Sequence, residues 1–368
     1  MKKGWEYKKL GEVCEIYQPK TISSKDLIPN GKYKVYGANG IIGRFDRYNH
    51  EESEVLLCCR GATCGAINES EPLSWINGNA MVIKPKSQII AKPFLKYQLI
   101  GLDFSKVITG AAQPQITRKT LSPTIIGFPP LSEQQRIVTY LDSTFAKIDA
   151  VAKNAEKSLN DAKALFQSAL AKMMEPKEGW EEVSMDELCS IESALVNPTK
   201  ADYINMLHVG GANIESYSGK LVNLKTAKEE KLSSGKFFFD NKAVLYNKIR
   251  PYLVKVAKPD FCGLCSADMY PLSPKNKVTR EFLYYILISK DFTDYAIKSS
   301  ARAGMPKINR NSLFAYKTSI PKDYKEQICI TSKLDSIRRG LITLESNLTL
   351  TLSECAALKQ SILRQTFE

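Results

Sequence analysis

Side chains that could catalyse a reaction or hold a metal ion are sparse in this sequence. Its 368 residues include two histidines, His50 and His208, which are too few for a histidine-rich metal site. Cys262 and Cys265 have the Cys-x-x-Cys spacing of zinc knuckles and redox pairs, but no second pair stands nearby. We interpret both histidines as ordinary polar residues and these cysteines as incidental thiols, and we expect neither a metal site nor a resident cofactor.

Motifs for phosphate, methyl or phosphodiester chemistry are incomplete as well. Ser218-Gly219-Lys220-Leu221 has no hydroxyl after its lysine, so it lacks the magnesium contact of a nucleotide-hydrolysing loop. Gly127-Phe128-Pro129-Pro130 has no amide or carboxylate that could accept a hydrogen bond from an amine undergoing methylation. Glu229-Glu230-Lys231 has a nuclease-like spacing but no Pro-Asp pair before it. We therefore expect a chain that is not an enzyme.

Residues suited to binding nucleic acid gather in two matching regions of the chain. Arginine and glutamine can form paired hydrogen bonds with guanine and adenine edges, whereas lysine and surface arginine mostly neutralise phosphates. Each of these residues alone could be a solvated surface group, but as a duplicated set they favour DNA contact. The candidates are Arg44, Arg47, Tyr48, Arg60, Gln113, Gln115, Arg118 and Lys119 in the first region, and Lys248, Arg250, Tyr252, Arg302, Lys307 and Arg310 in the second. We place Lys248, Arg250 and Tyr252 at the position equivalent to Arg60.

The overall charge supports a polyanionic partner. The formal net charge is +13, and 43% of the residues are hydrophobic, as in ordinary globular proteins. No signal peptide and no apolar run of membrane-spanning length is evident. The nine cysteines show no secreted-framework spacing, so we expect reduced thiols in a cytoplasmic protein.

Two long amphipathic segments must position these regions. The first begins near Ser132, which could form a capping box with Gln135, and its apolar residues recur every three or four positions up to Met173. The second begins near Asp323, with Glu326 at the same capping-box spacing, and keeps a heptad pattern to the end of the chain. Forty residues of helix are about 60 Å long. The two segments therefore predict an intramolecular coiled coil.

The sequence before each of these helices forms a mixed α/β lobe. In the first lobe, Asn30-Gly31, Asn39-Gly40 and Asn77-Gly78 are each compatible with a tight hairpin turn, and 93–100 predicts a short helix that starts with proline.

The second lobe repeats the first in the same order. Gly179-Trp180-Glu181 matches Gly4-Trp5-Glu6, and 281–288 matches the short helix of the first lobe. The residues 305–313 likewise match 113–121. A lobe followed by a long helix is therefore the unit of a tandem duplication.

The sequence resembles the specificity subunits of type I restriction-modification enzymes over essentially its whole length. The resemblance rests on the repeated Gly-Trp-Glu opening, on Leu57-Cys58-Cys59-Arg60-Gly61-Ala62-Thr63-Cys64-Gly65, and on Pro-Leu-Ser-Glu-Gln-Gln before the first long helix. The second helix departs from this pattern with Lys325-Glu326-Gln327. The resemblance implies α/β (α+β) target recognition domains at residues 1–131 and 176–320. It also implies spacer helices at 132–175 and 321–368 that form an antiparallel coiled coil.

The expected function is sequence-specific binding of a bipartite DNA site. By resemblance, the helices would dock two methyltransferase subunits, and restriction subunits that translocate and cut DNA would join them. AdoMet, ATP and magnesium would then belong to those partners. Three alternatives remain open: a specificity subunit of a related type II enzyme, a coiled-coil adaptor that does not bind DNA, and an enzyme that acts alone on DNA, which the missing motifs disfavour. The base sequence recognised cannot be predicted, because it depends on loop geometry and DNA shape.

Overall fold

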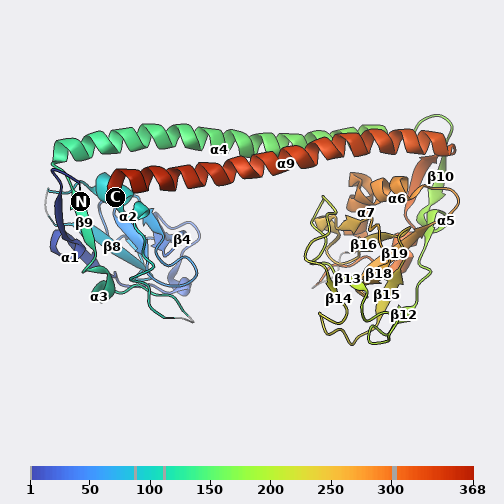
Figure 1. Ribbon diagram of the computed structural model, residues 1–368, viewed down its shortest axis with the longest axis horizontal. Coiled ribbons are helices and arrows are strands. Elements are labelled where there is room, and N and C mark those ends of the chain that lie inside the picture. Colours follow the sequence, from blue (N-terminus) through green and yellow to red (C-terminus); the bar gives the residue numbers. More distant parts are fainter. Residues whose placement is uncertain (1, 87–88, 111–112, 301–304) are drawn as a thin grey trace. The chain divides into compact units, whose positions relative to one another are not determined.

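The computed structural model describes residues 2–86, 89–110, 113–300 and 305–368, and the chain forms two compact units. One unit comprises Met1–Ala155 and Leu350–Glu368, and the other comprises Glu156–Thr349. Each unit contains one α/β lobe and a part of each long helix (Figure 1). The expected duplication of α/β lobes is confirmed.

The first lobe is organised around a four-stranded sheet in the order β2-β8-β5-β6. Val55 and Leu57 of β5 pack with helix α2, while Leu56 points to the opposite face and packs with Tyr36 and Ile76 of a smaller sheet, β4-β3-β7. Because strand side chains alternate between faces, the uninterrupted apolar run in β5 belongs to a strand covered on both sides. The elements of this lobe are β1 (Glu6–Lys9), α1 (Leu10–Val13), β2 (Cys14–Tyr17), η1 (Ser24–Asp26), β3 (Tyr33–Gly37), β4 (Gly40–Phe45), β5 (Val55–Cys58), β6 (Ile67–Glu69), β7 (Trp75–Ile76), β8 (Ala80–Pro85), α2 (Lys92–Gly101), α3 (Arg118–Leu121) and β9 (Ile125–Phe128).

The second lobe repeats this sheet as β11-β19-β16-β17. Val244 and Tyr246 of β16 pack with helix α6, and Leu245 packs with Phe237 and Phe239 of a five-stranded sheet, β12-β15-β18-β13-β14. The elements of this lobe are β10 (Trp180–Ser184), α5 (Met185–Leu188), β11 (Cys189–Ser190), β12 (Leu195–Val196), β13 (Leu207–Val209), β14 (Lys225–Thr226), β15 (Lys236–Phe239), β16 (Val244–Asn247), η2 (Pro251–Leu253), β17 (Val256–Ala257), β18 (Gly263–Cys265), β19 (Met269–Pro274), α6 (Arg280–Ile288), α7 (Lys290–Ser299), α8 (Arg310–Phe314) and β20 (Lys317–Pro321).

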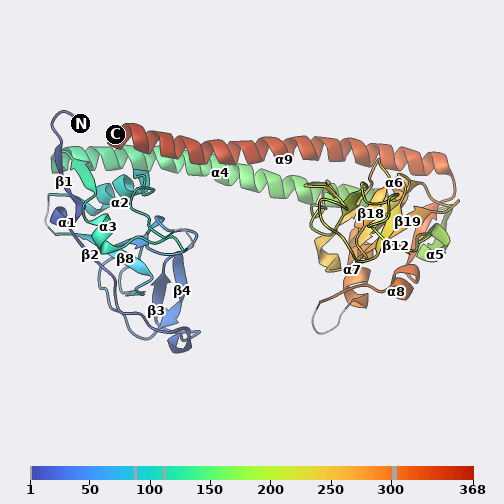
Figure 2. The same ribbon diagram turned by 60° about the horizontal axis from the view of Figure 1, so that its bottom comes forward.

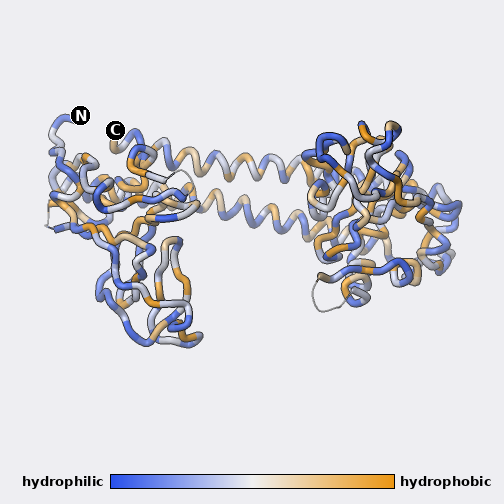
Figure 3. Tube along the Cα trace, turned by 90° about the horizontal axis from the view of Figure 1, so that it is seen from below, coloured by the Kyte–Doolittle hydropathy of each residue, from blue (hydrophilic) through white to orange (hydrophobic). Residues whose placement is uncertain are grey.

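The long helices are α4 (Leu131–Met173) and α9 (Tyr324–Phe367). In the first unit, Leu141 and Phe145 of α4 pack against Leu363, near the end of α9. In the second unit, Leu170, near the end of α4, shares a core with Leu334, near the start of α9. The start of each helix thus packs against the end of the other, which confirms an antiparallel coiled coil. Hydrophilic and hydrophobic residues alternate along both helices (Figure 3), and no helix among the described residues is long and apolar enough to cross a membrane.

The entry to each long helix differs from the expected capping boxes. Helix α4 begins at Leu131, so Ser132 lies inside the first turn and is not the N-cap. Asp323 does cap α9, since its carboxylate accepts a hydrogen bond from the backbone N–H of Lys325 (N···O 2.9 Å). Glu326, however, accepts a hydrogen bond from the Trp180 indole (3.0 Å) and does not reach back to the helix start.

A buried glutamine fixes each long helix to its own lobe. In the first unit, Gln134 accepts a hydrogen bond from the backbone N–H of Ala91 and donates to the carbonyl oxygens of Ile89 and Pro129. The donor–acceptor distance is 2.8 Å in all three bonds. Both backbone groups of the 89–91 segment stand just before α2. The Glu-Gln pair that stood out in the sequence therefore contains a structural anchor.

The second unit repeats this arrangement with a different loop. Gln327 accepts from the N–H of Thr279 (2.9 Å) and donates to the carbonyl oxygens of Lys277 (2.9 Å) and Pro321 (3.0 Å). Both glutamine side chains are fully buried, where an amide is tolerated only when it is hydrogen-bonded.

Of the three Asn-Gly pairs, one forms the expected hairpin. Asn39-Gly40 joins the antiparallel strands β3 and β4. Asn77-Gly78 instead leads from β7, which pairs parallel with β3, into β8 of the other sheet. Asn30-Gly31 precedes β3, and a Cβ at Gly31 would lie 2.7 Å from the backbone nitrogen of Phe45. Close packing, and not a hairpin, explains that glycine.

Candidate nucleic-acid interface

In the first lobe, the candidate residues meet where β5 ends. The backbone of Arg60 lies opposite Gln115 in an isolated antiparallel bridge. The N–H of Gly61 donates to the carbonyl oxygen of Pro114 (3.1 Å), and the N–H of Ile116 donates to that of Cys59 (3.0 Å). Thr117 then caps α3, whose first two residues are Arg118 and Lys119. The structure thus brings together candidates that are more than fifty positions apart in the sequence.

The second lobe builds the same edge at the end of β16. Ile249 lies opposite Lys307 in an isolated bridge, and the N–H of Arg250 donates to the carbonyl oxygen of Pro306 (2.8 Å). The N–H of Ile308 donates to the carbonyl oxygen of Lys248 (3.1 Å). Helix α8 then begins with Arg310, after its N-cap Asn309.

This register corrects the equivalence proposed from the sequence. Arg60 and Ile249 occupy corresponding positions, so Lys248 corresponds to Cys59 and Arg250 to Gly61. The glycine and the arginine both have left-handed backbones, with φ of +87° and +51°. Matching the lobes by residue type and order missed the offset, because only the backbone pairing with residues 114–116 and 306–308 reveals it.

We name the first edge as Arg60, Gln115, Arg118 and Lys119, and the second edge as Arg250, Lys307 and Arg310. All seven side chains are exposed. None of them forms a side-chain hydrogen bond or ion pair with another residue in the part of the chain that the structure describes. Their donors are therefore available to a ligand, and every charged member is positive.

Lys248 differs from the second edge because it is held within the lobe. Its ammonium donates to the carbonyl oxygen of Ala267 (2.7 Å), lies 4.0 Å from the carboxylate of Asp268 and stands over the Tyr270 ring. Burial lowers the pKa of Lys248, and the positive charges of Lys307 and Arg310 lower it further, although Asp268 opposes them. Lys248 is thus a structural lysine beside a cationic surface.

The candidates on the hairpin of the first lobe are mixed in character. The guanidinium of Arg44 donates to the carbonyl oxygens of Gly31 (2.5 Å) and Lys32 (3.0 Å), so it stabilises the lobe. Arg47 is exposed, and the partly exposed Tyr48 ring packs edge-on against Tyr33 at 5.0 Å. Arg44 stands four residues from the hairpin turn, about 13 Å along an extended strand.

The turn of that hairpin lies beside the loop that follows Arg60, because Asn68 donates to the carbonyl oxygen of Ala38 (3.2 Å) and Thr63 bonds to Asn39. Ile41 and Ile42, just after the turn, are 54% and 49% exposed. We missed these two residues in the sequence, although two consecutive apolar residues cannot both face one side of a strand. They are added to the candidate surface. Figure 2 shows β3 and β4 together in this lobe.

The remaining candidates occupy loops. Gln113 is exposed, and Arg302 lies outside the described residues. Tyr252, which is 47% exposed, belongs to η2, and its carbonyl oxygen accepts a hydrogen bond from the hydroxyl of Tyr217 (3.3 Å).

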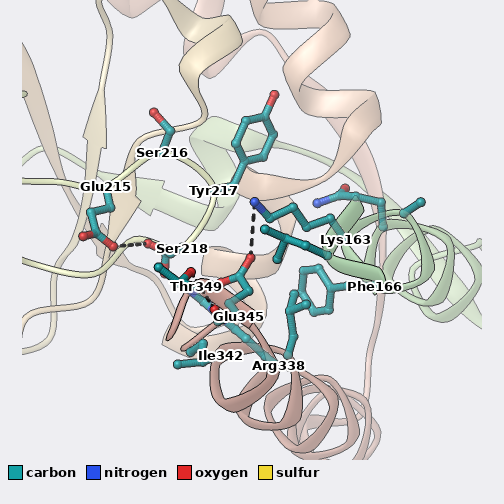
Figure 4. Close-up of a pocket in the computed structure, with 14 residues that line it drawn as sticks. Lys163, Phe166, Glu215, Ser216, Tyr217, Ser218, Arg338, Ile342, Glu345 and Thr349 are labelled. Carbon is teal, nitrogen blue, oxygen red and sulfur yellow. Dashed lines mark hydrogen bonds and ion pairs between the residues drawn. The ribbon is translucent and has the colours of Figure 1, made fainter. Parts of the chain in front are cut away.

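Tyr217 also lines a cavity of about 550 Å³ in the second unit (Figure 4). The turn that contains Tyr217 and Ser218 forms one wall, and helices α4 and α9 form the other. An ion pair between Lys163 and Glu345 (3.5 Å) joins the helices there, and Arg338 donates to the carbonyl oxygen of Ser218. The cavity walls are mainly apolar, and among their polar side chains the Ser218 hydroxyl donates a hydrogen bond to the Glu215 carboxylate (3.1 Å).

The two histidines have local hydrogen-bond partners, and the two cysteines of the Cys-x-x-Cys pair differ in exposure. Cys262 is exposed, whereas burial raises the pKa of the Cys265 thiol to about 12. His208 pairs with Glu230 (2.8 Å), and His50 lies 2.9 Å from the Tyr17 hydroxyl. Within the described ranges, no group of three or more histidine, cysteine or acidic residues could hold a metal ion.

Comparisons with known proteins agree with this architecture. A family model described as the type I restriction modification DNA specificity domain matches residues 2–160 and, again, 177–354. The specificity subunit of the Escherichia coli type I restriction enzyme EcoDI is 26% identical over 405 residues, which cover 99% of this chain and 88% of that protein. A solved structure described as the basis of complex assembly and conformational transition of the type I R-M system superposes with a TM-score of 0.73 at 18% identity, covering 100% of this chain and 98% of that one. The chain belongs to the type I restriction modification DNA specificity domain family and is a specificity subunit with two copies of that domain.

Proposed function

We propose that this subunit binds a split DNA sequence, with the first lobe contacting one half-site through the first edge and the second lobe contacting the other through the second edge. The observation that carries this proposal is the shared backbone pairing that presents unpaired, exposed Arg, Lys and Gln side chains in both lobes. Free guanidinium and amide donors suit base edges and phosphates.

The partners proposed from the family resemblance are two methyltransferase subunits on the long helices and restriction subunits that join them. AdoMet, ATP and magnesium would be bound by those partners, and this chain would catalyse no step. Support comes from apolar side chains that both helices leave exposed: Leu131, Tyr140, Val151 and Leu165 on α4, and Ile328, Ile337, Ile342, Leu344, Leu350 and Leu358 on α9. Where exposed apolar residues of this kind form a contiguous patch, they are typical of a protein-binding surface.

The test is to map methylated sites in DNA from a host that expresses this chain with the methyltransferase of the same system. We expect one split sequence. The double substitution Arg60→Ala with Arg118→Ala should relax one half-site, and Arg250→Ala with Lys307→Ala should relax the other. Lys322→Ala, an exposed lysine outside both edges, is the matched control and should change neither. Methylation at a continuous site, or equal loss at both half-sites from either double variant, would contradict the proposal.

A further inference from the structure

The second lobe contains a five-residue segment, Arg250–Val254, whose two ends have left-handed backbones. Arg250 has φ and ψ of 51° and 65°, and Val254 has 45° and 56°. Residues with a Cβ rarely adopt this conformation, and a β-branched valine is especially disfavoured in it. Pro251 adds a further restriction, because a proline normally keeps the preceding residue extended.

Backbone hydrogen bonds hold the segment in this conformation. The first is the bond from the N–H of Arg250 to the carbonyl oxygen of Pro306 described above. Within the segment, the N–H of Leu253 donates to the carbonyl oxygen of Arg250 (2.9 Å), and the N–H of Val254 donates to the carbonyl oxygen of Pro251 (2.9 Å). The N–H of Tyr217 donates to the carbonyl oxygen of Val254 (3.1 Å). Glycine at position 250 could form the same bonds without the steric cost.

The first lobe shows that glycine fits this position. Gly61 holds the corresponding place with φ of +87°, and its N–H donates to Pro114 as that of Arg250 does to Pro306. The adjacent arginine of the first edge, Arg60, is replaced by Ile249 in the second lobe. The arginine has therefore moved by one residue onto a backbone that disfavours it. Strain of this kind is typical of functional sites.

The Arg250 side chain contributes nothing visible to its own lobe. It is exposed, and its guanidinium has no hydrogen bond or ion pair with any residue in the described ranges. Lys307 and Arg310 provide positive charge on the same edge, so charge alone does not explain an arginine at position 250. A phosphate contact tolerates many side-chain directions, whereas a paired contact with a base edge requires a fixed one.

We infer that Arg250 is the specificity-determining residue of the second half-site and that it contacts a guanine edge in the major groove, while Lys307 and Arg310 neutralise phosphates. This assignment rests on the proposed function. Guanine is the base whose two adjacent acceptors match the arginine fork. The left-handed backbone sets the direction in which that fork leaves the strand end.

The experiment selects bound duplexes from a randomised pool with the purified full chain and compares the enriched sequences for the parent and four variants. We expect the parent to enrich a split motif. Arg250→Lys keeps the positive charge but loses the fork, so the preference for one guanine in one half-site should fall about 10-fold, within a range of roughly 5- to 150-fold. Arg250→Gly should lose the same preference. The other half-site should stay unchanged in both.

Two variants serve as controls. Lys307→Ala should weaken binding to all sequences and reduce the salt dependence of binding by about one phosphate contact. Val254→Gly relieves the other strained residue and should leave the sequence preference intact. Arg250→Gly should raise the melting temperature of the chain, because it removes a Cβ from a left-handed backbone at an exposed position. Val254→Gly should lower it, because the Val254 side chain is buried in the core of the lobe and its loss leaves a cavity.

The outcomes separate the two proposals. An unchanged guanine preference in Arg250→Lys, beside a clear split motif for the parent, overturns the role of Arg250 and leaves the proposed function standing. A lower melting temperature of Arg250→Gly overturns the strain argument. A parent chain that enriches no split motif overturns the proposed function, and the assignment of Arg250 with it.

Discussion

The two lobes share their attachment to the long helices and differ in their second sheet, called here the outer sheet. In the first lobe, the outer sheet has three strands in the order β4-β3-β7, whereas in the second it has five strands in the order β12-β15-β18-β13-β14. By contrast, Trp5 packs on Phe94 and Trp180 packs on Phe282 with centroid distances of 5.9 and 6.2 Å. The attachment and the backbone pairing of the edge are therefore the constant part, and the outer sheet and the side chains of the edge are the variable part.

This difference separates two tasks within one domain. The constant part holds the long helices through buried polar and aromatic contacts that tolerate little change. The variable part must fit different bases, so its strands can change in number as long as the pairing that holds the edge is kept. Each prediction below changes a contact or a backbone position of the constant part, and most compare the same change in the two units.

The largest effect is expected from the two buried glutamines. Gln134→Ala should destabilise the first unit by about 3–4 kcal/mol, because it leaves three backbone groups, one buried and two partly buried, without their hydrogen-bond partner. Gln327→Ala should cost a similar amount in the second unit. Hydrogen exchange should increase at residues 89–91 in the first variant and at 277–279 in the second. Gln135→Ala and Lys325→Ala, which change exposed neighbours, should have effects below about 0.5 kcal/mol. If either glutamine variant increased hydrogen exchange equally at 89–91 and at 277–279, the two glutamines would not anchor their units separately.

Next in size are the glycines that open each repeat. Gly4 and Gly179 have φ of +81° and +88°, and a Cβ at either would meet no atom within 4 Å. Alanine should therefore cost about 1–2 kcal/mol at each position through backbone strain alone. Gly340 is the control, because it lies inside α9 with equally open space, and alanine there should stabilise the chain by about 0.5–1 kcal/mol. Urea unfolding measures all three, and a destabilising Gly340→Ala would refute the strain explanation.

These glycines show what the sequence could predict. The repeated Gly-Trp-Glu, the helical periodicity and the order of the matching segments are local or order-dependent signals, and they predicted the duplication and the long helices. Helix entry was predicted less well. A Ser-x-x-Gln pattern resembles a capping box, but the neighbouring Gln134 is the residue that is buried, and only the position of the 89–91 loop explains why.

The edge was predicted only in part for a related reason. Exposed cations could be selected by type and by repeated position, but their partners depend on long-range pairing. Arg44 and Lys248 turned out to bond to carbonyl oxygens of their own lobe. Arg250 proved to correspond to Gly61, and Ile41 and Ile42 became candidates only through their exposure. The bases recognised depend on where these side chains project, which residue type alone does not determine.

A smaller effect is expected from a repeated hydrogen bond between α2 or α6 and the adjacent long helix. The hydroxyl of Tyr285 donates to the carboxylate of Asp335, and the hydroxyl of Tyr97 donates to the carboxylate of Asp142, with an O···O distance of 2.5 Å in each case. Tyr285 is fully buried, whereas Tyr97 and Asp142 are more accessible to water. Burial, helped by Asp335, raises the pKa of Tyr285, so its hydroxyl remains a proton donor throughout the neutral range.

Tyr285→Phe should therefore cost about 1 kcal/mol and Tyr97→Phe about 0.5 kcal/mol, because water replaces the lost partner more easily at the exposed site. The midpoint of urea unfolding, followed separately in each unit by hydrogen exchange, measures both. The ring contacts are retained in phenylalanine, so packing loss does not enter the comparison. A larger cost at Tyr97 would show that burial does not govern the strength of this bond.

The smallest effect is expected from the ion pairs that join the two long helices. Lys163 pairs with Glu345 in the second unit, and Lys359 pairs with Asp149 in the first. All four side chains are at least partly exposed, and exposed pairs contribute between 0 and about 1 kcal/mol. In a double-mutant cycle of Lys163→Ala and Glu345→Ala, we expect a coupling energy below about 0.5 kcal/mol at low salt. This energy should vanish near 1 M salt, because the Debye length falls to about 3 Å.

The apolar stripe, which includes Leu141 and Leu363 in the first unit and Leu170 and Leu334 in the second, would then hold the helices together. A Lys359 and Asp149 cycle provides the matched measurement in the other unit. A coupling above about 1.5 kcal/mol that persists in high salt would mean that charge, and not the stripe, pairs the helices in that unit.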